Sequence, residues 1–352
     1  MYNNDRLIGT RDFVHKNGSV YNESSHGTSC LSLMAGNIPD KYVGTAPLAS
    51  YFLCRTEDVS SENMIEEYNW VSAAEFLDSI GIDIISTSLG YVDFDLPQWD
   101  HVYSDLDGET SVITIGSEIA CSKGILCVTS AGNEGGTSFP YISVPSDGKN
   151  VLTVGAVDKY GDQAFFSSVG PTFDGRIKPD VMAHGYNVMV AVTWGTGYAE
   201  GSGTSFSCPV LAGMAACLWQ ANKQLPASSI RDLLRQNANY SDNPNNNYGY
   251  GIPDFKNAFE DMIIGENPNF VINSLISVFP NPSDGNVNVN IETIGEVCVE
   301  VYDHIGKLLY SNMVTRYYIS ELNSFLDGLS SGVYLIKVND DENNQTVKLV
   351  KY

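Results

Sequence analysis

Short, nearly continuous runs of apolar residues recur through the first three quarters of the chain, separated by polar stretches. Three of these runs, IDIISTSL, GILCVTSA and NVLTVGAV, have the length of β-strands and lie beside Gly, Ser or Asn. Strands without polar alternation are typical of a parallel sheet whose two faces are both covered. The pattern therefore predicts a doubly wound α/β domain with a mostly parallel sheet.

Apolar residues at helical spacing predict the helices that cover this sheet. Between residues 61 and 80, Met64, Tyr68 and Val71 recur on common faces. Pro209–Ala221 is an apolar segment that begins with proline. We expect a helix there with Pro209 in its first turn, where the missing N–H costs least. A turn and a short helix then close this domain, which we place at residues 1–262.

The pattern changes to a period of two after a polar linker, 263–275. The segments VNVNIETI, VCVEVYDH, GVYLIKVN and QTVKLVKY all alternate apolar and polar positions. Asn-Pro, Asp-Gly and Ser-Gly pairs mark the turns between them. Residues 276–352 are therefore predicted to form a small antiparallel β-sandwich, too small to enclose an active site of its own.

Composition narrows the class of protein. Of 352 residues, 43% are hydrophobic and 17% charged, which is a globular balance. The net charge of −23 argues against nucleic-acid binding, because phosphate recognition depends on clusters of Lys and Arg. No stretch approaches the roughly 20 apolar residues that a membrane span needs, so no transmembrane segment is expected.

The seven cysteines are scattered and form neither a CxxC pair nor a zinc-ligand spacing. Several lie in apolar runs, such as Cys127 in GILCVTS and Cys217 in MAACLW. We expect them to be small buried hydrophobic residues, and a single disulfide remains open.

Three short segments carry the types of residue that nucleophilic catalysis requires. HGTSC begins at His26, SAGNEG contains Asn133, and GTSFSCP contains Ser205. A serine hydroxyl becomes a useful nucleophile only when a neighbouring imidazole takes its proton. Ser205 lies where a helix is expected to begin, so backbone N–H groups there could stabilise an oxyanion.

These segments resemble those of the subtilisin-like (S8) serine peptidases, in the same order along the chain. STSLG and RIKPDVMAHG match two further segments of the family, so the resemblance extends from Ser25 to about Ala221. It implies a serine endopeptidase with Ser205 as nucleophile, His26 as general base and Asn133 as oxyanion donor. It also implies residues that bind the polypeptide substrate: Ser88, Leu89 and Gly90 along its backbone, and Ala131 and Gly132 as walls of the primary specificity pocket.

The aspartate of the family's triad is not found at its usual place. In this family it precedes the histidine at the end of an apolar strand, and only 25 residues precede His26. Asp5 and Asp12 are the candidates, but neither follows an apolar run that could carry it to the imidazole. We therefore expect the aspartate upstream of residue 1. The alternative is an inactive subtilisin-fold protein that binds peptides without cutting them.

No cofactor is predicted, although an acidic stretch from Asp93 to Gly108 leaves calcium open, since clustered carboxylates suit this ion. Its spacing matches no EF-hand, and a solvated acidic loop is the preferred interpretation. We predict no metal site. The remaining histidines are expected to be structural or to lie at the surface.

The second domain resembles the C-terminal sorting domain of type IX secretion cargo, on FPNPSDGNVNV, VEVYDHIGKLLY, LSSGVYLIKV and the terminal VKLVKY. The resemblance implies export to the cell surface or medium and recognition by the type IX secretion machinery. A plain β-sandwich that binds carbohydrate or acts as a spacer is the alternative for this domain.

Overall fold

The computed structural model describes residues 6–15, 18–193, 197–264, 276–279, 281–283, 285–291, 297–314, 319–339 and 344–352. The chain divides into two compact units, Met1–Glu266 and Asn267–Tyr352. The predicted linker, 263–275, lies outside the described residues from 265 onward. None of the helices in the described ranges is both long and apolar enough to cross a bilayer.

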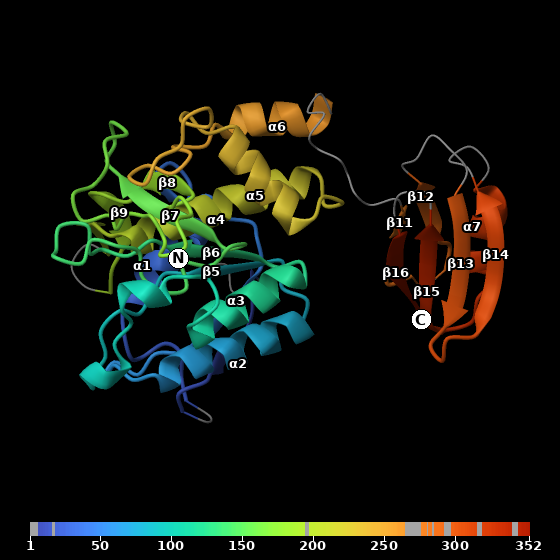
Figure 1. Ribbon diagram of the computed structural model, residues 1–352, viewed down its shortest axis with the longest axis horizontal. Helices are drawn as coiled ribbons and strands as arrows, with labels where there is room; N and C mark the ends of the chain where they lie inside the picture. Colours follow the sequence, from blue (N-terminus) through green and yellow to red (C-terminus); the bar gives the residue numbers. More distant parts are fainter. Residues whose placement is uncertain are drawn as a thin grey trace. The chain divides into compact units, whose positions relative to one another are not determined.

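The larger unit is built on a parallel sheet of four strands in sequential order (Figure 1). These are β5 (Ile84–Thr87), β6 (Leu126–Ser130), β7 (Leu152–Val157) and β8 (Val181–His184). The first three coincide with the apolar runs of the sequence. Every residue of β6 and β7 is buried, as expected for strands covered on both faces.

Helices cover both faces of this sheet, so the predicted doubly wound α/β fold is confirmed. Helix α4 (Thr204–Ala221) crosses one face, with α5 (Ala227–Gln236) beside it and α6 (Phe255–Ile264) behind them. Helices α2 (Ile65–Ser79) and α3 (Val112–Ser122) pack together on the other face.

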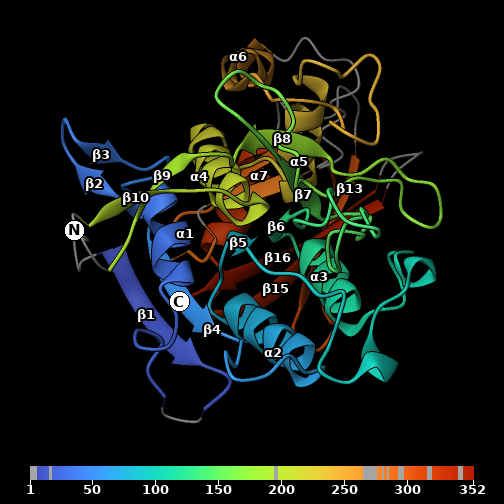
Figure 2. The same cartoon turned by 90° about the vertical axis from the view of Figure 1, so that its left-hand side faces the viewer.

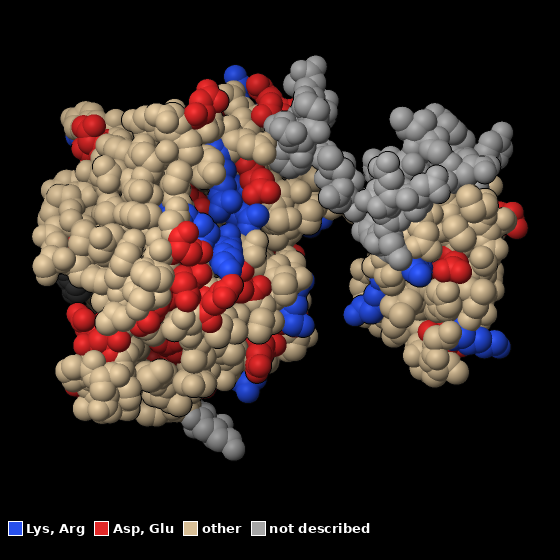
Figure 3. Space-filling view, viewed as in Figure 1, with Lys and Arg blue, Asp and Glu red and all other residues tan. Residues whose placement is uncertain are grey.

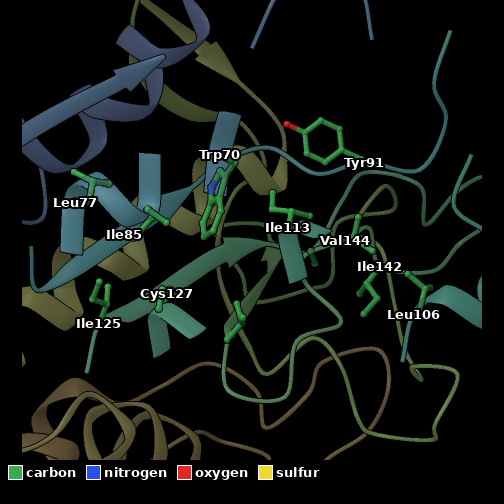
Figure 4. Close-up of a cluster of buried hydrophobic side chains, with 14 of the residues drawn as sticks. Trp70, Leu77, Ile85, Tyr91, Leu106, Ile113, Ile125, Cys127, Ile142 and Val144 are labelled. Carbon is green, nitrogen blue, oxygen red and sulfur yellow. The ribbon is translucent and has the colours of Figure 1, made fainter. Parts of the chain in front are cut away.

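The core between the sheet and α2 and α3 is apolar (Figure 4). Ile113 has no exposed surface, and Ile85 and Cys127 project from the sheet into the same cluster. The Trp70 indole donates a hydrogen bond to the Thr87 hydroxyl at 3.1 Å, so its one polar atom is satisfied. This layer fixes where β5 and β6 end.

A second, two-stranded parallel sheet pairs β1 (Leu7–Asp12) with β4 (Tyr51–Arg55), and Figure 2 shows them side by side. Within the described ranges, no ladder joins this pair to the four-stranded sheet, so β4 and β5 each have one strand neighbour. All five residues of β4 are half-buried, in contrast to β6 and β7. Two short antiparallel pairs complete the unit: β2 (Asn37–Ile38) with β3 (Tyr42–Val43), and β9 (Val188–Ala191) with β10 (Tyr198–Gly201).

The start of α4 differs from the prediction. The helix begins at Thr204, so Pro209 lies inside it and not in its first turn. A proline in a helix leaves the carbonyl four residues earlier without its N–H partner, here the carbonyl of Ser205. The prediction relied on local preference, whereas side chains from other segments satisfy this carbonyl, as described below.

The smaller unit is antiparallel, as predicted. Its main sheet has the order β14 (Leu308–Val314), β13 (Val297–Asp303), β15 (Gly332–Asn339) and β16 (Asn344–Lys351). β11 (Ile276–Phe279) pairs with β12 (Asn288–Ile291). The sequence analysis missed α7 (Ser320–Asp327), whose Leu322 and Leu326 are fully buried in the core of this unit.

All seven cysteines are free thiols. Cys30, Cys127 and Cys208 are buried, as predicted, whereas Cys217 is exposed and the others, Cys54, Cys121 and Cys298, are half-buried. Cys217 lies in an apolar run but on the outer side of α4, where its thiol donates to the Thr45 carbonyl at 3.3 Å. The expectation that it is buried was wrong, because an apolar run in a helix does not give all its residues the same face.

Charged residues are mostly at the surface, and Figure 3 shows Lys and Arg of the larger unit gathered in a band bordered by acidic side chains. Lys178 and Asp180 are among the charged residues that are buried. The Lys178 ammonium donates to Asp180 at 2.8 Å and to the Thr153 hydroxyl at 3.0 Å, and Arg235 also donates to Asp180. Burial raises the pKa of Asp180, but the two cations outweigh it and hold that pKa below its usual range. The group ties β7 and the residues just before β8 to α5.

We predict that Asp180→Asn lowers the free energy of unfolding by about 4 kcal/mol, because it leaves two cations without their buried anion. Urea unfolding at pH 7 measures this. Because the folded pKa of Asp180 is lowered, its contribution is present above the unfolded pKa and is lost as the pH falls through the folded pKa. Asp174→Asn is the control: it breaks an exposed ion pair with Arg176 and should cost about 1 kcal/mol or less.

Candidate active site

Ser205 is the second residue of α4 and is half-buried. The first N–H groups of a helix have no acceptor within the helix, and its dipole makes this end positive. The Ser205 hydroxyl donates to the Ser88 carbonyl at 3.3 Å, which is long for an O–H···O hydrogen bond. The hydroxyl is therefore only weakly held and sits beside donors that suit a developing negative charge.

The Ser205 carbonyl is the point where three segments meet. Pro209 cannot supply an N–H to it. Instead it accepts a hydrogen bond from the Ser88 hydroxyl at 2.9 Å and another from the Cys30 thiol at 3.3 Å. Ser88 follows β5, and Cys30 belongs to α1 (His26–Ala35). The interior proline thus lets side chains of two distant segments bind the backbone of Ser205.

His26 is the first residue of α1, and Cys30 contacts both its ring and the Ser205 carbonyl. The Cys30 sulfur, one turn further along the helix, lies 3.7 Å from Nε2 and 4.0 Å from Nδ1. The Phe206 ring is on another side, with 6.1 Å between ring centroids. Although the residue as a whole is exposed, these neighbours desolvate the charged imidazolium and lower the pKa of His26. A lowered pKa favours the neutral imidazole, which is able to accept a proton.

Two buried thiols lie beneath this region as neutral donors. Burial raises the pKa of Cys30 to about 12 and that of Cys208 to about 11. The Cys208 thiol contacts the carbonyls of Val128 at 3.4 Å and Thr87 at 3.5 Å. Cys208 therefore ties α4 to β5 and β6, close to the point where Ser88 follows β5.

Asn133 lies three residues after the end of β6 and is exposed. Its side-chain oxygen accepts from the Thr204 backbone N–H at 2.9 Å and from the Thr204 hydroxyl at 3.1 Å. Both bonds use Oδ1, and in the described part of the chain Nδ2 makes no hydrogen bond. The amide is thus held at the start of α4 with its donor nitrogen available.

The predicted substrate-binding residues differ in their accessibility. Ser88 and Leu89 are half-buried and Gly90 is exposed, so this segment is open to a ligand. A Cβ at Gly90 would meet the Ser143 hydroxyl at 2.2 Å, which explains the glycine. Ala131, by contrast, has no exposed surface and packs in the core.

Gly132 adopts a φ of +108°, and its N–H and carbonyl both contact the Thr204 hydroxyl at 3.2 Å. Only glycine adopts this backbone conformation readily. Of the two predicted pocket walls, therefore, Gly132 contacts Thr204, the first residue of α4, whereas Ala131 lies in the buried core next to it.

The two aspartate candidates do not meet His26. Asp5 lies outside the described residues. The Asp12 carboxylate accepts from Arg55 at 3.0 Å and from the backbone N–H groups of Val14 at 2.8 Å and His15 at 2.9 Å. Burial raises its pKa, but these donors outweigh burial and lower it. Asp12 thus holds β1 to β4, and no carboxylate contacts His26 within the described ranges.

In the acidic stretch from residue 93 to 108, Asp100 and Asp107 accept hydrogen bonds within local turns, whereas Asp95 accepts from the distant Glu62 N–H at 3.1 Å. Asp107 accepts from the N–H groups of Glu109 and Thr110, both at 2.8 Å, and Asp100 accepts from that of Phe94. Such bonds stabilise loops without a metal.

A separate group, Glu57, Glu62 and Glu66, has carboxylate oxygens within 4.8 Å of one another, a spacing that could hold a hard cation. Burial and the neighbouring carboxylates raise the pKa of Glu62 to about 7. Glu57 and Glu66 are also engaged internally, with the Tyr91 hydroxyl and the Asp58 N–H.

The sequence motifs singled out Ser205, His26 and Asn133 as candidates, but not the residues that contact them. Cys30 and Thr204 lie inside the same motifs, yet their contacts with Ser205 and Asn133 depend on how separate segments pack. The only sequence signal for these contacts was Cys30 itself, a residue with a polar side chain one helical turn after His26.

The sequence pattern of the subtilase family matches residues 4–251, and that of a secretion system C-terminal sorting domain matches residues 277–352. The chain is 30% identical over 282 residues to serine protease AprX of Bacillus subtilis (strain 168), covering 72% of this chain and 62% of AprX. It is 30% identical over 248 residues to Subtilisin NAT of Bacillus subtilis subsp. natto, covering 69% of this chain and 58% of that protein. The chain thus spans about three fifths of the length of these relatives.

Solved structures share the fold of the larger unit. A mutant of the protease domain of PatA superposes with a TM-score of 0.60 at 22% identity, over 74% of this chain and 90% of that one. The MycP3 protease from the type VII (ESX-3) secretion system gives 0.58 at 22% identity, over 72% and 78%.

We predict that Pro209→Ala slows covalent labelling of Ser205 by a fluorophosphonate about tenfold. Alanine restores an N–H that competes for the Ser205 carbonyl, and losing one bond of about 1.4 kcal/mol corresponds to a tenfold change. Thermal unfolding should show no loss of stability, because alanine favours the helix. Unchanged labelling would show that the contacts from Ser88 and Cys30 do not position the nucleophile.

Proposed function

The chain belongs to the subtilase family, and we propose that it is an exported serine endopeptidase in which Ser205 attacks the peptide carbonyl and His26 acts as general base and then general acid. The observation that carries this proposal is the convergence of α1, β5 and α4 on the Ser205 carbonyl. It supports a nucleophile and a neutral imidazole held on adjoining helices, as acyl transfer requires.

The first step moves the proton of Ser205. Its hydroxyl is held only by the long bond to the Ser88 carbonyl, so it can turn towards His26 as the substrate binds. The imidazole takes the proton as the Ser205 oxygen attacks the peptide carbon, then gives it to the leaving amine. Water repeats the sequence to release the acyl group.

The oxyanion formed in each step needs donors that are already in place. We assign this role to Nδ2 of Asn133 and the backbone N–H of Ser205. The two bonds that Thr204 donates to Oδ1 of Asn133 support the assignment, because they fix the amide with its nitrogen free. The positive end of α4 adds to the same potential.

A polypeptide substrate would lie along Ser88, Leu89 and Gly90. These residues follow the last ladder residue of β5, and an extended peptide can add its backbone to such a segment. Gly132 borders the same region through its contacts with Thr204. Main-chain pairing of this kind would bind many sequences, with side-chain preference set by the surrounding pockets.

The sorting domain marks the chain as a secreted or cell-surface protein. We propose that residues 276–352 are recognised by the type IX secretion machinery, while the larger unit carries the activity. The separate core of the smaller unit supports this division, because β13, β15 and α7 bury their apolar residues within it.

The second candidate function is peptide binding without cleavage. It is favoured by one observation: in the described residues, His26 contacts thiol and aromatic groups and no carboxylate. An aspartate fixes the tautomer of the imidazole and stabilises the imidazolium. Without one, turnover is expected to fall by about four orders of magnitude, the loss that this change causes in subtilisin.

We predict that a fluorophosphonate labels Ser205 and that Ser205→Ala and His26→Ala both abolish the labelling. Peptide mapping by mass spectrometry identifies the modified residue. Ser207→Ala is the matched control, since Ser207 lies in the same motif but is buried and donates to the Thr204 carbonyl. A chain that binds peptides yet takes up no label would support the second candidate.

Deletion of residues 276–352 is predicted to stop export while the larger unit remains folded and is labelled at Ser205 inside the cell. The reason is that the two units have separate cores. Immunoblotting of cells and medium measures the distribution. Normal release of the shortened chain would disprove the sorting role.

A further inference from the structure

A pair of cysteines lies outside the catalytic region, where α3 turns into β6. Cys121 is the last but one residue of α3, and Cys127 is the second residue of β6. The Cys127 sulfur lies 3.8 Å from the Ser117 carbonyl, one helical turn before Cys121 and on the same face of α3. Cys127 belongs to a buried apolar cluster, and Cys121 packs against that cluster.

Cys121 opens into a cavity of about 140 Å³ between α3, β6 and α5. Its wall includes Ala227 and Ser228, the first two residues of α5, and Arg231 one turn later. Arg231 is fixed there by bonds to the side chain of Asn150 at 2.9 Å and to its carbonyl at 3.1 Å. A helix N-terminus and a guanidinium facing one thiol make a setting that favours a thiolate.

The environments of the two thiols are therefore unlike. The neighbouring Cys127 thiol, together with Arg231, lowers the pKa of Cys121. The neighbouring Cys121 thiol, with burial, raises the pKa of Cys127. Cys127 is only 2% exposed, so Cys121 is the thiol that a reagent can reach. An accessible, reactive thiol beside a buried second thiol is typical of dithiols that form a disulfide in two steps, in which the first thiol reacts with the oxidant and the second then displaces it.

We propose that Cys121 and Cys127 form a redox-active dithiol that reacts with a low-molecular-weight disulfide, such as glutathione disulfide, in the cavity. The Cys121 thiolate attacks one sulfur of the small disulfide, forms a mixed disulfide and releases one thiolate. Cys127 then attacks the Cys121 sulfur and passes its proton to the second leaving thiolate. Two electrons move from the protein to the reagent, and a Cys121–Cys127 disulfide remains.

The bond would join the end of α3 to β6, the strand that leads to Asn133. An exported protein passes into oxidising surroundings, where such a bond persists. The dithiol is independent of Ser205 and His26, so this proposal stands whether or not the chain cleaves peptides.

The test treats the full chain with glutathione disulfide, stops the reaction with acid and maps the peptides after trypsin digestion. Trypsin cuts after Lys123, between the two cysteines, so the disulfide appears as a linked pair of peptides. Cys127→Ser should instead trap a stable glutathione adduct on Cys121, and Cys127→Ala should do the same if serine disturbs folding. Cys121→Ser should leave Cys127 unmodified.

Cys217 is the internal control, because it is exposed and contacts a backbone carbonyl instead of a second thiol. It should keep a glutathione adduct without forming a linked pair. At pH 7, Cys121 should react with iodoacetamide about tenfold faster than Cys217, and the difference should disappear in urea. A stable adduct on Cys121 in the unmodified chain, or no reaction there at all, would overturn the proposal.

Discussion

The carbonyl oxygen of Ser205 is the acceptor on which the catalytic region depends. Because Pro209 lacks an N–H, this oxygen is left open inside an otherwise regular helix. The Ser88 hydroxyl and the Cys30 thiol donate hydrogen bonds to this oxygen, and each belongs to a different part of the fold. In a helix without this proline, the Ser205 carbonyl would be bonded within the helix. Because that local bond is missing, the carbonyl can bind donors from α1 and from the segment after β5.

The same contact determines the surroundings of His26. Cys30 holds the Ser205 carbonyl while its sulfur lies under the imidazole, so one residue contacts both partners of the proposed proton transfer. Its pKa of about 12 keeps the thiol neutral, so it adds no charge that would hold the imidazolium. Desolvation without a compensating anion lowers the pKa of His26. This setting favours a proton acceptor, and a carboxylate would be needed to favour the protonated form.

How much of this the sequence could predict follows from the range of the interactions involved. β6 and β7 were found because full burial leaves a continuous apolar run. Ser205 and His26 could be proposed from the sequence because their motifs are local. The start of α4 was misplaced because a proline is normally found in a first turn, and only donors from distant segments make its interior position tolerable. Likewise α7 was missed, since its eight residues are too few to show a clear period among alternating strands. Contacts between segments distant in the sequence were beyond reach.

Ser88, Asn133 and Ser205 are far apart in the sequence but meet at one edge of the parallel sheet. Parallel strands point their carboxyl ends to the same edge, and this edge is where α/β proteins place their ligands. Ser88 follows β5 and Asn133 follows β6, and the ladder between these strands sets them side by side. The N-terminus of α4 approaches that edge and is fixed from both sides, through Ser88 on Ser205 and through Asn133 on Thr204. Since these bonds reach adjacent residues of one helical turn, the positions of Ser205 and Asn133 are coupled to each other. The relative position of Ser205 and Asn133 is therefore set mainly by the edge of the parallel sheet, and less by the segments that follow β5 and β6.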